Sequence, residues 1–254
     1  MPGDAGTELP EGGRPAFYAL RPGGWRDYWT LLHPPYTVWH LSHVAIGAAA
    51  APRFSAWRLG LSVLAFFFAI GLSAHALDEL AGRPLGTRIP ARILQAIAGV
   101  GMAAAVALGV YGVLSFSVWL LVFMAFGIFI LVAYNLELFG GRFHSDAWFA
   151  ISWGAFPALT GYFAQSAAIR WPALPVAAAC LFLAAAQRRL STPVRMLRRK
   201  VASLEGRMRL RDGTEVGVDE ALFRAGPEAA LRILSVAVTL LAIGVVGARL
   251  TASP

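Results

Sequence analysis

Three side chains near the end of one apolar segment have the types and the spacing needed for metal chemistry. His75 precedes Asp78 by three residues and Glu79 by four, so a helix would project all three near one face. Carboxylates in this arrangement can bind Mg²⁺, which takes one or two protein carboxylates together with water and phosphate oxygens. Histidine beside carboxylates could instead bind iron or zinc directly. An acidic pair at the end of a membrane segment is costly to insert and unnecessary for orientation, so we interpret Asp78 and Glu79 as functional.

Further polar residues flank the other apolar segments and are expected at the same membrane depth. The predicted metal ligands are His75, Asp78, Glu79, Glu137, His144 and Asp146. Two of these have plainer interpretations, because Asp146 could cap a helix N-terminus and Glu137 could be a solvated charge paired with Arg142. His40 and His43 are also three residues apart, and they could either bind a substrate or hydrogen-bond a neighbouring helix.

The elements that must position these residues are apolar and long. Hydrophobic residues make up 57% of the chain and charged residues 14%, against about a quarter charged in soluble domains, which argues against an ordinary soluble protein. Seven segments are each long enough to cross about 30 Å of hydrocarbon as a helix. They are residues 36–52, 57–77, 93–112, 114–134, 147–166, 171–187 and 229–249. The sequence therefore predicts an all-α fold, a polytopic membrane bundle of about seven transmembrane helices.

The basic residues are distributed unevenly over the loops between these segments. Only four of the 22 lysines and arginines fall on one side, namely Arg53, Arg58, Arg170 and Arg249. The excess on the other side predicts that this side, with the N-terminus, is cytoplasmic. A net charge of +8 would suggest nucleic acid in a soluble protein, but here the charges flank membrane segments and favour anionic lipid headgroups instead. We expect a multi-pass protein of a bacterial cytoplasmic membrane, without a nucleic-acid partner.

The polar parts of the chain define its organisation. Residues 1–30 are predicted to be a disordered cytoplasmic tail, and 31–254 a single membrane helical-bundle domain with a cytoplasmic surface segment at 188–228. Apolar residues in that segment recur at intervals of three and four and predict an amphipathic helix over 193–209, lying on the membrane or against a partner helix. The apolar stripe comprises Val194, Leu197, Val201, Leu204 and Met208. A short hairpin is predicted around Asp212-Gly213.

Four stretches carry a family resemblance. They read HPPYTVWHLSHVAIGAAAAP at His33–Pro52, SAHALDELAGRPLGTRIPAR at Ser73–Arg92, YNLELFGGRFHSD at Tyr134–Asp146 and WFAISWGAFPALTGYFA at Trp148–Ala164. Together they resemble the UbiA superfamily of intramembrane prenyltransferases, of which the chain looks like a divergent member. Asp78 stands in the place of the family's first Asp-rich motif, whereas Gln187-Arg188-Arg189 stands where the second is expected. The resemblance implies a UbiA-like bundle that binds an isoprenoid diphosphate with Mg²⁺.

The leading functional interpretation is an enzyme that transfers or cyclises an isoprenoid chain from its diphosphate at the cytoplasmic face. The predicted catalytic residues are Asp78, Glu79, Glu137 and Tyr134. The predicted substrate-binding residues are Arg83, Arg142, His40, His43, Asn135, Trp39 and Trp153. In this interpretation the arginines offset phosphate charge and the aromatic rings stabilise an allylic cation by cation–π contact.

Two other interpretations use the same bundle. The five histidines, with the nearby carboxylates, could form an iron or zinc site for chemistry on a lipid. Alternatively, the absence of a second acidic motif favours a non-catalytic lipid-binding protein. The partner is in each case a lipid, either an isoprenoid diphosphate or another amphiphile.

Overall fold

The computed structural model describes residues 14–252, and these are mostly helical. Four helices begin the chain: α1 (Trp25–Leu31), α2 (Pro34–Ala50), α3 (Ala56–Phe66) and, after the π-helical segment η2 (Phe67–Ala74), α4 (His75–Leu80). Next come α5 (Ala91–Ser115), α6 (Leu120–Asn135), α7 (Asp146–Ala150), the π-helical η3 (Ile151–Ala155) and α8 (Phe156–Ser166). The chain ends with α9 (Ala173–Lys200), strands β1 (Gly206–Arg209) and β2 (Glu215–Val218), and α10 (Glu220–Thr251).

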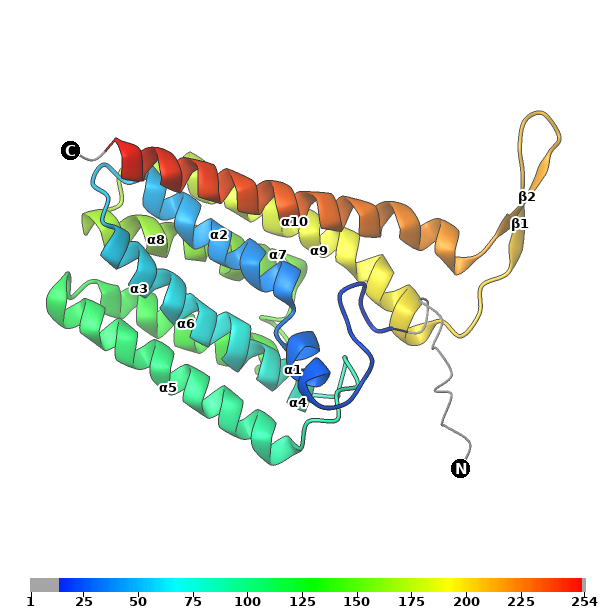
Figure 1. Cartoon of the computed structure of the whole chain (residues 1–254), viewed down its shortest axis with the longest axis horizontal. Helices are drawn as coiled ribbons and strands as arrows, with labels where there is room; N and C mark the ends of the chain where they lie inside the picture. The colour runs from blue at the N-terminus through cyan, green and yellow to red at the C-terminus, as the bar shows by residue number, and fades with distance from the viewer. Residues whose placement is uncertain (1–13, 253–254) are drawn as a thin grey trace, which may run out of the picture.

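The long helices lie side by side in one bundle (Figure 1). Helix α2 packs between α8 and α10, α9 packs on η3 and α10, and α5 packs on η2. The segment 14–33 and α4 lie at one end of the long helices, which we call the N-terminal end of the bundle; the β-hairpin extends from the same end, while the C-terminus lies at the other (Figure 1). The loops 81–90 and 136–145 also belong to the N-terminal end, because each joins a helix that ends there to one that begins there.

Four helical stretches are long and apolar enough to cross a membrane. They are Ala56–Leu80, Ala91–Ser115, Ala173–Lys200 and Glu220–Thr251. Helix α6 is apolar as well but has 16 residues. The prediction of a helical membrane protein is thus confirmed, with the small β1–β2 hairpin as an addition to an otherwise helical chain.

Helices α2 and α8 approach each other so closely that only glycine fits at the crossing. A Cβ on Gly47 would lie 1.9 Å from the carbonyl oxygen of Ala158, and a Cβ on Gly161 would lie 2.2 Å from that of Val44. Small residues allow such backbone contact between membrane helices, where van der Waals packing replaces the hydrophobic effect as the main attraction. The α2–α8 contact therefore depends on these glycines.

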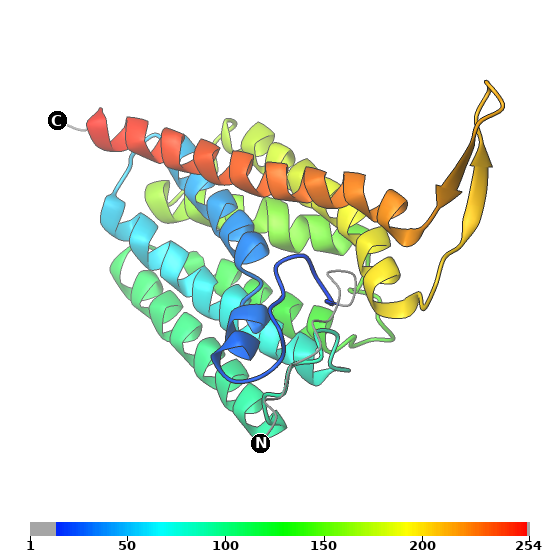
Figure 2. The ribbon, with the colours of Figure 1, turned by 45° about the vertical axis from the view of Figure 1, so that its right-hand side comes forward.

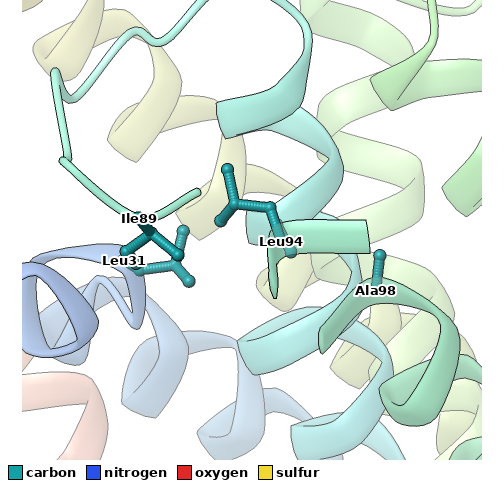
Figure 3. Close-up of a cluster of buried hydrophobic side chains, with 5 residues drawn as sticks. Leu31, Ile89, Leu94 and Ala98 are labelled. Carbon is teal, nitrogen blue, oxygen red and sulfur yellow. The ribbon is translucent and has the colours of Figure 1, made fainter. Parts of the chain in front are cut away.

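The prediction of a disordered tail over residues 1–30 is wrong for residues 14–30; residues 1–13 lie outside the described part of the chain. The carboxylate of Asp27 accepts hydrogen bonds from the backbone N–H of Gly23 at 2.9 Å and of Arg88 at 3.1 Å, which ties α1 to the loop before α5. A buried apolar cluster joins the same parts (Figure 3). It comprises Leu31, Ala76, Ile89, Leu94 and Ala98. These long-range contacts order a segment whose polar composition suggested disorder.

The predicted surface helix over 193–209 is also wrong. Residues 193–200 continue α9, and 206–209 form β1 instead. Val194 and Leu197 are buried inside the protein rather than facing lipid headgroups. Two contacts hold that part of α9 against the bundle: the backbone carbonyls of Arg14 and Pro15 accept hydrogen bonds from the guanidinium groups of Arg198 and Arg199, and the Arg198 guanidinium also pairs with the buried carboxylate of Glu228 in α10.

The predicted hairpin is confirmed. β1 and β2 pair antiparallel, with Gly206 opposite Val218 and Arg209 opposite Glu215. In the turn, Asp212 accepts a hydrogen bond from the backbone N–H of Thr214 at 2.9 Å, and this bond lowers the pKa of the Asp212 carboxyl. The hairpin projects away from the bundle in both views (Figures 1 and 2).

The glycine contact yields a stability prediction. Gly47→Ala should destabilise the bundle by about 1–3 kcal/mol, because the added methyl group forces α2 away from α8. Gly60→Ala is the matched control, since Gly60 is an exposed helical glycine with nothing within 4 Å of an added Cβ. We expect a lower thermal unfolding temperature in detergent for the first variant only. Equal unfolding temperatures would contradict the role of the close contact.

Candidate functional site

A polar cavity of about 170 Å³ lies at the N-terminal end of the bundle. Its wall is built from α2, η2, α4, the end of α6, α7, η3 and α9, and residues 15–18 line it as well. Seven of the predicted site residues line it: His40, His75, Asp78, Tyr134, Asn135, His144 and Trp153. The structure thus brings together residues from four helical stretches that are far apart in the sequence.

A second, apolar cavity of about 140 Å³ lies deeper in the bundle, between α3, α5, α6 and α8. Its wall consists mainly of aliphatic and aromatic side chains. Ile70 of η2 and Trp153 of η3 line both cavities, so the two spaces adjoin at these side chains. Both boundary residues belong to π-helical segments, which are rare and occur often at functional sites.

The two histidines of α2 are held by a single acceptor in η3. The Nδ1 atoms of His40 and His43 each lie 3.0 Å from the carbonyl oxygen of Trp153. A carbonyl only accepts, so both Nδ1 atoms carry hydrogen, and Nε2 is the acceptor in each neutral ring. His40 also lines the polar cavity, whereas His43 is fully buried outside it. The structure supports a structural interpretation for His43 and leaves His40 as a candidate ligand-binding residue.

Glu79 does not face the cavity. One carboxylate oxygen accepts from the backbone N–H of Leu85 at 3.0 Å, and the other accepts from the backbone N–H and the hydroxyl of Thr87, each at 2.8 Å. The side chain is fully buried and ties down the loop 81–90. Arg83 is likewise turned to its own loop, where it donates to the carbonyls of Thr87 and Ile89. The predicted roles of Glu79 in metal binding and of Arg83 in phosphate binding do not fit these positions.

The remaining predicted site residues also lie outside the cavity wall. Glu137 is largely exposed and lies 3.8 Å from the Nδ1 of His144. Asp146 lies outside the cavity wall and pairs with Arg188 at 2.9 Å. Arg142 is exposed and Trp39 is fully buried, and neither lines the cavity.

The donors present do not fit a metal centre built on carboxylates. Among the residues that the structure describes, no group of three or more His, Cys, Asp or Glu side chains is placed to hold a metal ion. Asp78 is the only carboxylate in the described wall of the cavity, because Glu79 is engaged in the loop. The described residues therefore fit neither the predicted Mg²⁺ site nor the alternative iron or zinc site.

Several residues of the cavity wall were not predicted as site residues. They are Tyr18, Tyr36, Gln187, Arg188, Arg195 and Arg199; His33, which also lines the cavity, was predicted only as one of the five histidines of the alternative iron or zinc site. Arg188, Arg195 and Arg199 follow one another at intervals of seven and four residues, which places them on one face of α9. This spacing could have identified them as a group in the sequence. Tyr18 had no such signal, because it lies in a segment that looked disordered.

His33 and Tyr18 lie in contact in the cavity wall, with ring centroids 5.4 Å apart, and the His33 and His75 rings lie 4.1 Å apart. Burial lowers the pKa of His33 well below its usual range, and the nearby His75 and Arg199 lower it further. Burial also raises the pKa of Tyr18 well above its usual range. Both groups are therefore neutral near pH 7.

The acidic pair yields a second prediction. Glu79→Gln should destabilise the protein by about 1–3 kcal/mol, because an amide offers one acceptor oxygen where three donors now point at a carboxylate. Asp78→Asn should change stability much less, since Asp78 lies in the cavity wall and accepts none of these bonds. Thermal unfolding of the two variants in detergent provides the measurement. A larger loss for Asp78→Asn would contradict this assignment.

The buried His33 yields a third prediction. The unfolded chain protonates His33 below its usual pKa of about 6.5, whereas the folded protein resists protonation, so stability is present above that pH and declines as the pH falls below it. His33 has φ +46°, which Asn tolerates, so His33→Asn should keep the backbone. We expect the loss of thermal stability between about pH 7.5 and 5.5 to be smaller in this variant. An unchanged loss would show that other groups cause it.

Comparison with known proteins gives no match: no family model, no curated protein and no solved structure is detectably similar to the chain.

Proposed function

We propose that this protein is a multi-pass membrane enzyme that binds an isoprenoid diphosphate, or a closely related lipid phosphate, and transfers or cyclises the isoprenoid chain. The observation that carries the proposal is the pair of adjoining cavities. The polar cavity suits a charged headgroup, the apolar cavity suits a hydrocarbon chain, and Ile70 and Trp153 lie between them. A lipid phosphate has the same two parts in the same order.

The proposed membrane topology has seven crossings, with the N-terminus in the cytoplasm. Besides the four long spans, α2, α6 and the continuous helix at residues 146–166 supply three shorter crossings. The charge asymmetry of the loops supports a cytoplasmic N-terminal end. The polar cavity then opens near the cytoplasmic membrane surface, where a lipid headgroup lies.

The proposed reaction breaks the bond between C1 of the isoprenoid chain and a diphosphate oxygen. The bonding electrons leave with the diphosphate, and the resulting allylic cation is attacked by an acceptor or by a double bond of its own chain. Tyr134 and Trp153 lie in the cavity wall with ring centroids 5.7 Å apart, and they can stabilise the cation through their π faces. Asp78 is placed to accept the proton that the reaction releases.

The sequence resemblance to the UbiA superfamily supports this class of reaction. The proposal departs from that resemblance at the metal, because the carboxylates do not gather in the cavity. The same departure favours a second candidate, a lipid-binding protein of the same architecture without catalysis. In that case Asp78 would line the cavity without accepting a proton in any reaction.

The proposal predicts that blocking the apolar cavity removes the lipid. Ala105 of α5 lines this cavity, and Ala105→Phe should fill part of it and exclude the chain. Ala103→Phe, two residues away on the exposed side of the same helix, is the matched control. Mass spectrometry of the purified proteins should find a co-purifying isoprenoid lipid in the wild type and in the control, and at least tenfold less in Ala105→Phe. Equal lipid in both variants would refute the binding site.

Asp78→Asn separates the two candidates. With radiolabelled geranylgeranyl diphosphate and membrane extract as the source of acceptor, an enzyme should release diphosphate and lose most of this activity in the variant. Lipid binding without turnover in the wild type would favour the non-catalytic protein.

A further inference from the structure

Three arginines of α9 face the polar cavity. Arg188, Arg195 and Arg199 are separated by seven and four residues, so they recur on one face of the helix, and all three line the cavity. We propose that this arginine face binds a phosphate or diphosphate group directly, without a divalent metal ion. The inference rests on the proposed function only for the position of the headgroup.

The charges around the cavity are not balanced. The described wall contains three arginines and one carboxylate, Asp78. Arg188 is paired with Asp146, which lies outside the wall. Within residues 14–252, neither Arg195 nor Arg199 forms an ion pair with a carboxylate. These two guanidinium groups therefore carry the positive charge that an anion would neutralise.

Both guanidinium groups keep hydrogen-bond donors for a ligand. Arg195 donates to the Thr192 hydroxyl at 3.4 Å, and Nε of Arg199 donates to the Pro15 carbonyl at 3.2 Å. A guanidinium has five N–H donors, so these contacts leave most of them unused. Its planar fork matches the spacing of phosphate oxygens and often binds two of them at once.

The arrangement of Arg195 favours an anion over a cation. Arg195 lies near enough to Arg188 and Arg199 for their like charges to repel, and the polar rings of Tyr36 and Tyr134 lie close to it as well. A phosphate between the arginines would turn this repulsion into attraction in a partly buried site, where water screens charges weakly. A divalent cation would be repelled by the same three groups, and in the described wall Asp78 is the one carboxylate that would attract it.

The position of these residues in the chain is consistent with this role. Gln187-Arg188-Arg189 stands where the resemblance leads one to expect a second Asp-rich motif, and both Gln187 and Arg188 line the cavity. Fixed positive charge on α9 thus occupies the place where carboxylates would recruit metal. The headgroup class that this chemistry recognises is a phosphate or diphosphate, whether free or attached to a lipid.

The test uses the full-length protein in a neutral detergent with inorganic pyrophosphate as the probe, titrated by calorimetry in EDTA. We expect binding in EDTA, and we expect Arg195→Gln and Arg199→Gln each to weaken it at least tenfold, as loss of a charge-assisted contact implies. Arg211→Gln is the matched control, because Arg211 is exposed in the hairpin. Its affinity should stay within twofold of the wild type.

Arg195→Lys is the control for misfolding, because it keeps the positive charge and removes only the planar guanidinium group. It should bind more weakly than the wild type and more tightly than Arg195→Gln, at an unchanged thermal unfolding temperature. Repeating the titration with geranylgeranyl diphosphate identifies the source of the phosphate: equal affinities indicate a free phosphate ligand, and much tighter binding of the lipid indicates a headgroup. Either result supports the site.

Three outcomes would overturn the inference. They are binding that requires added Mg²⁺, binding that survives both glutamine substitutions, and failure of the wild type to bind either probe in EDTA. In the last case, an isoprenoid that still co-purifies and is lost in Ala105→Phe would leave the proposed lipid-binding function intact. Conversely, metal-free pyrophosphate binding without any co-purifying isoprenoid would support the arginine site and reject the proposed lipid.

Discussion

The carbonyl group of Trp153 connects the parts of this protein on which the site depends. In an α-helix that oxygen would accept from the backbone N–H four residues on, but this residue is Pro157, which has no N–H, and the Nδ1 atoms of His40 and His43 in α2 both lie 3.0 Å from the oxygen instead. Inside a membrane an unpaired carbonyl is costly, so the pair of imidazoles stabilises the π-helical turn and joins α2 to η3. The same turn places the Trp153 ring between the polar and the apolar cavity.

Charge at the N-terminal end of the bundle has two consequences that come from the same residues. The basic run that closes α9 supplies much of the charge asymmetry from which we propose a cytoplasmic N-terminal end. Because α9 continues through residue 200 and is covered by segment 14–20, part of this run lies in the cavity instead of on the surface. A topology signal in the sequence thus becomes a feature of the site once the N-terminal segment packs against it.

Asp78 and Glu79 are adjacent acidic residues with different positions in the structure, one in the cavity wall and one bound to the loop before α5. Consecutive residues on a helix point about 100° apart. Asp78 reaches the cavity, while the three donors of Leu85 and Thr87 surround Glu79 and fix the loop before α5. Because its oxygens accept hydrogen bonds from the loop, Glu79 does not join Asp78 in the cavity wall.

The sequence by itself determined the helical membrane class, the approximate position of the long helices and the hairpin at Asp212-Gly213, because apolar length and turn chemistry are local properties. It also placed His40, His75, Asp78, Tyr134 and His144 at one depth, since helix ends must lie near the membrane surface. The tertiary structure alone decided which of them meet. Contacts between segments far apart in the chain decided three features. They decided that α9 continues from residue 187 to Lys200, that residues 14–30 are ordered, and that Glu79 faces the loop instead of the cavity. Such contacts leave no periodic signal in the sequence, because they arise only when the helices pack.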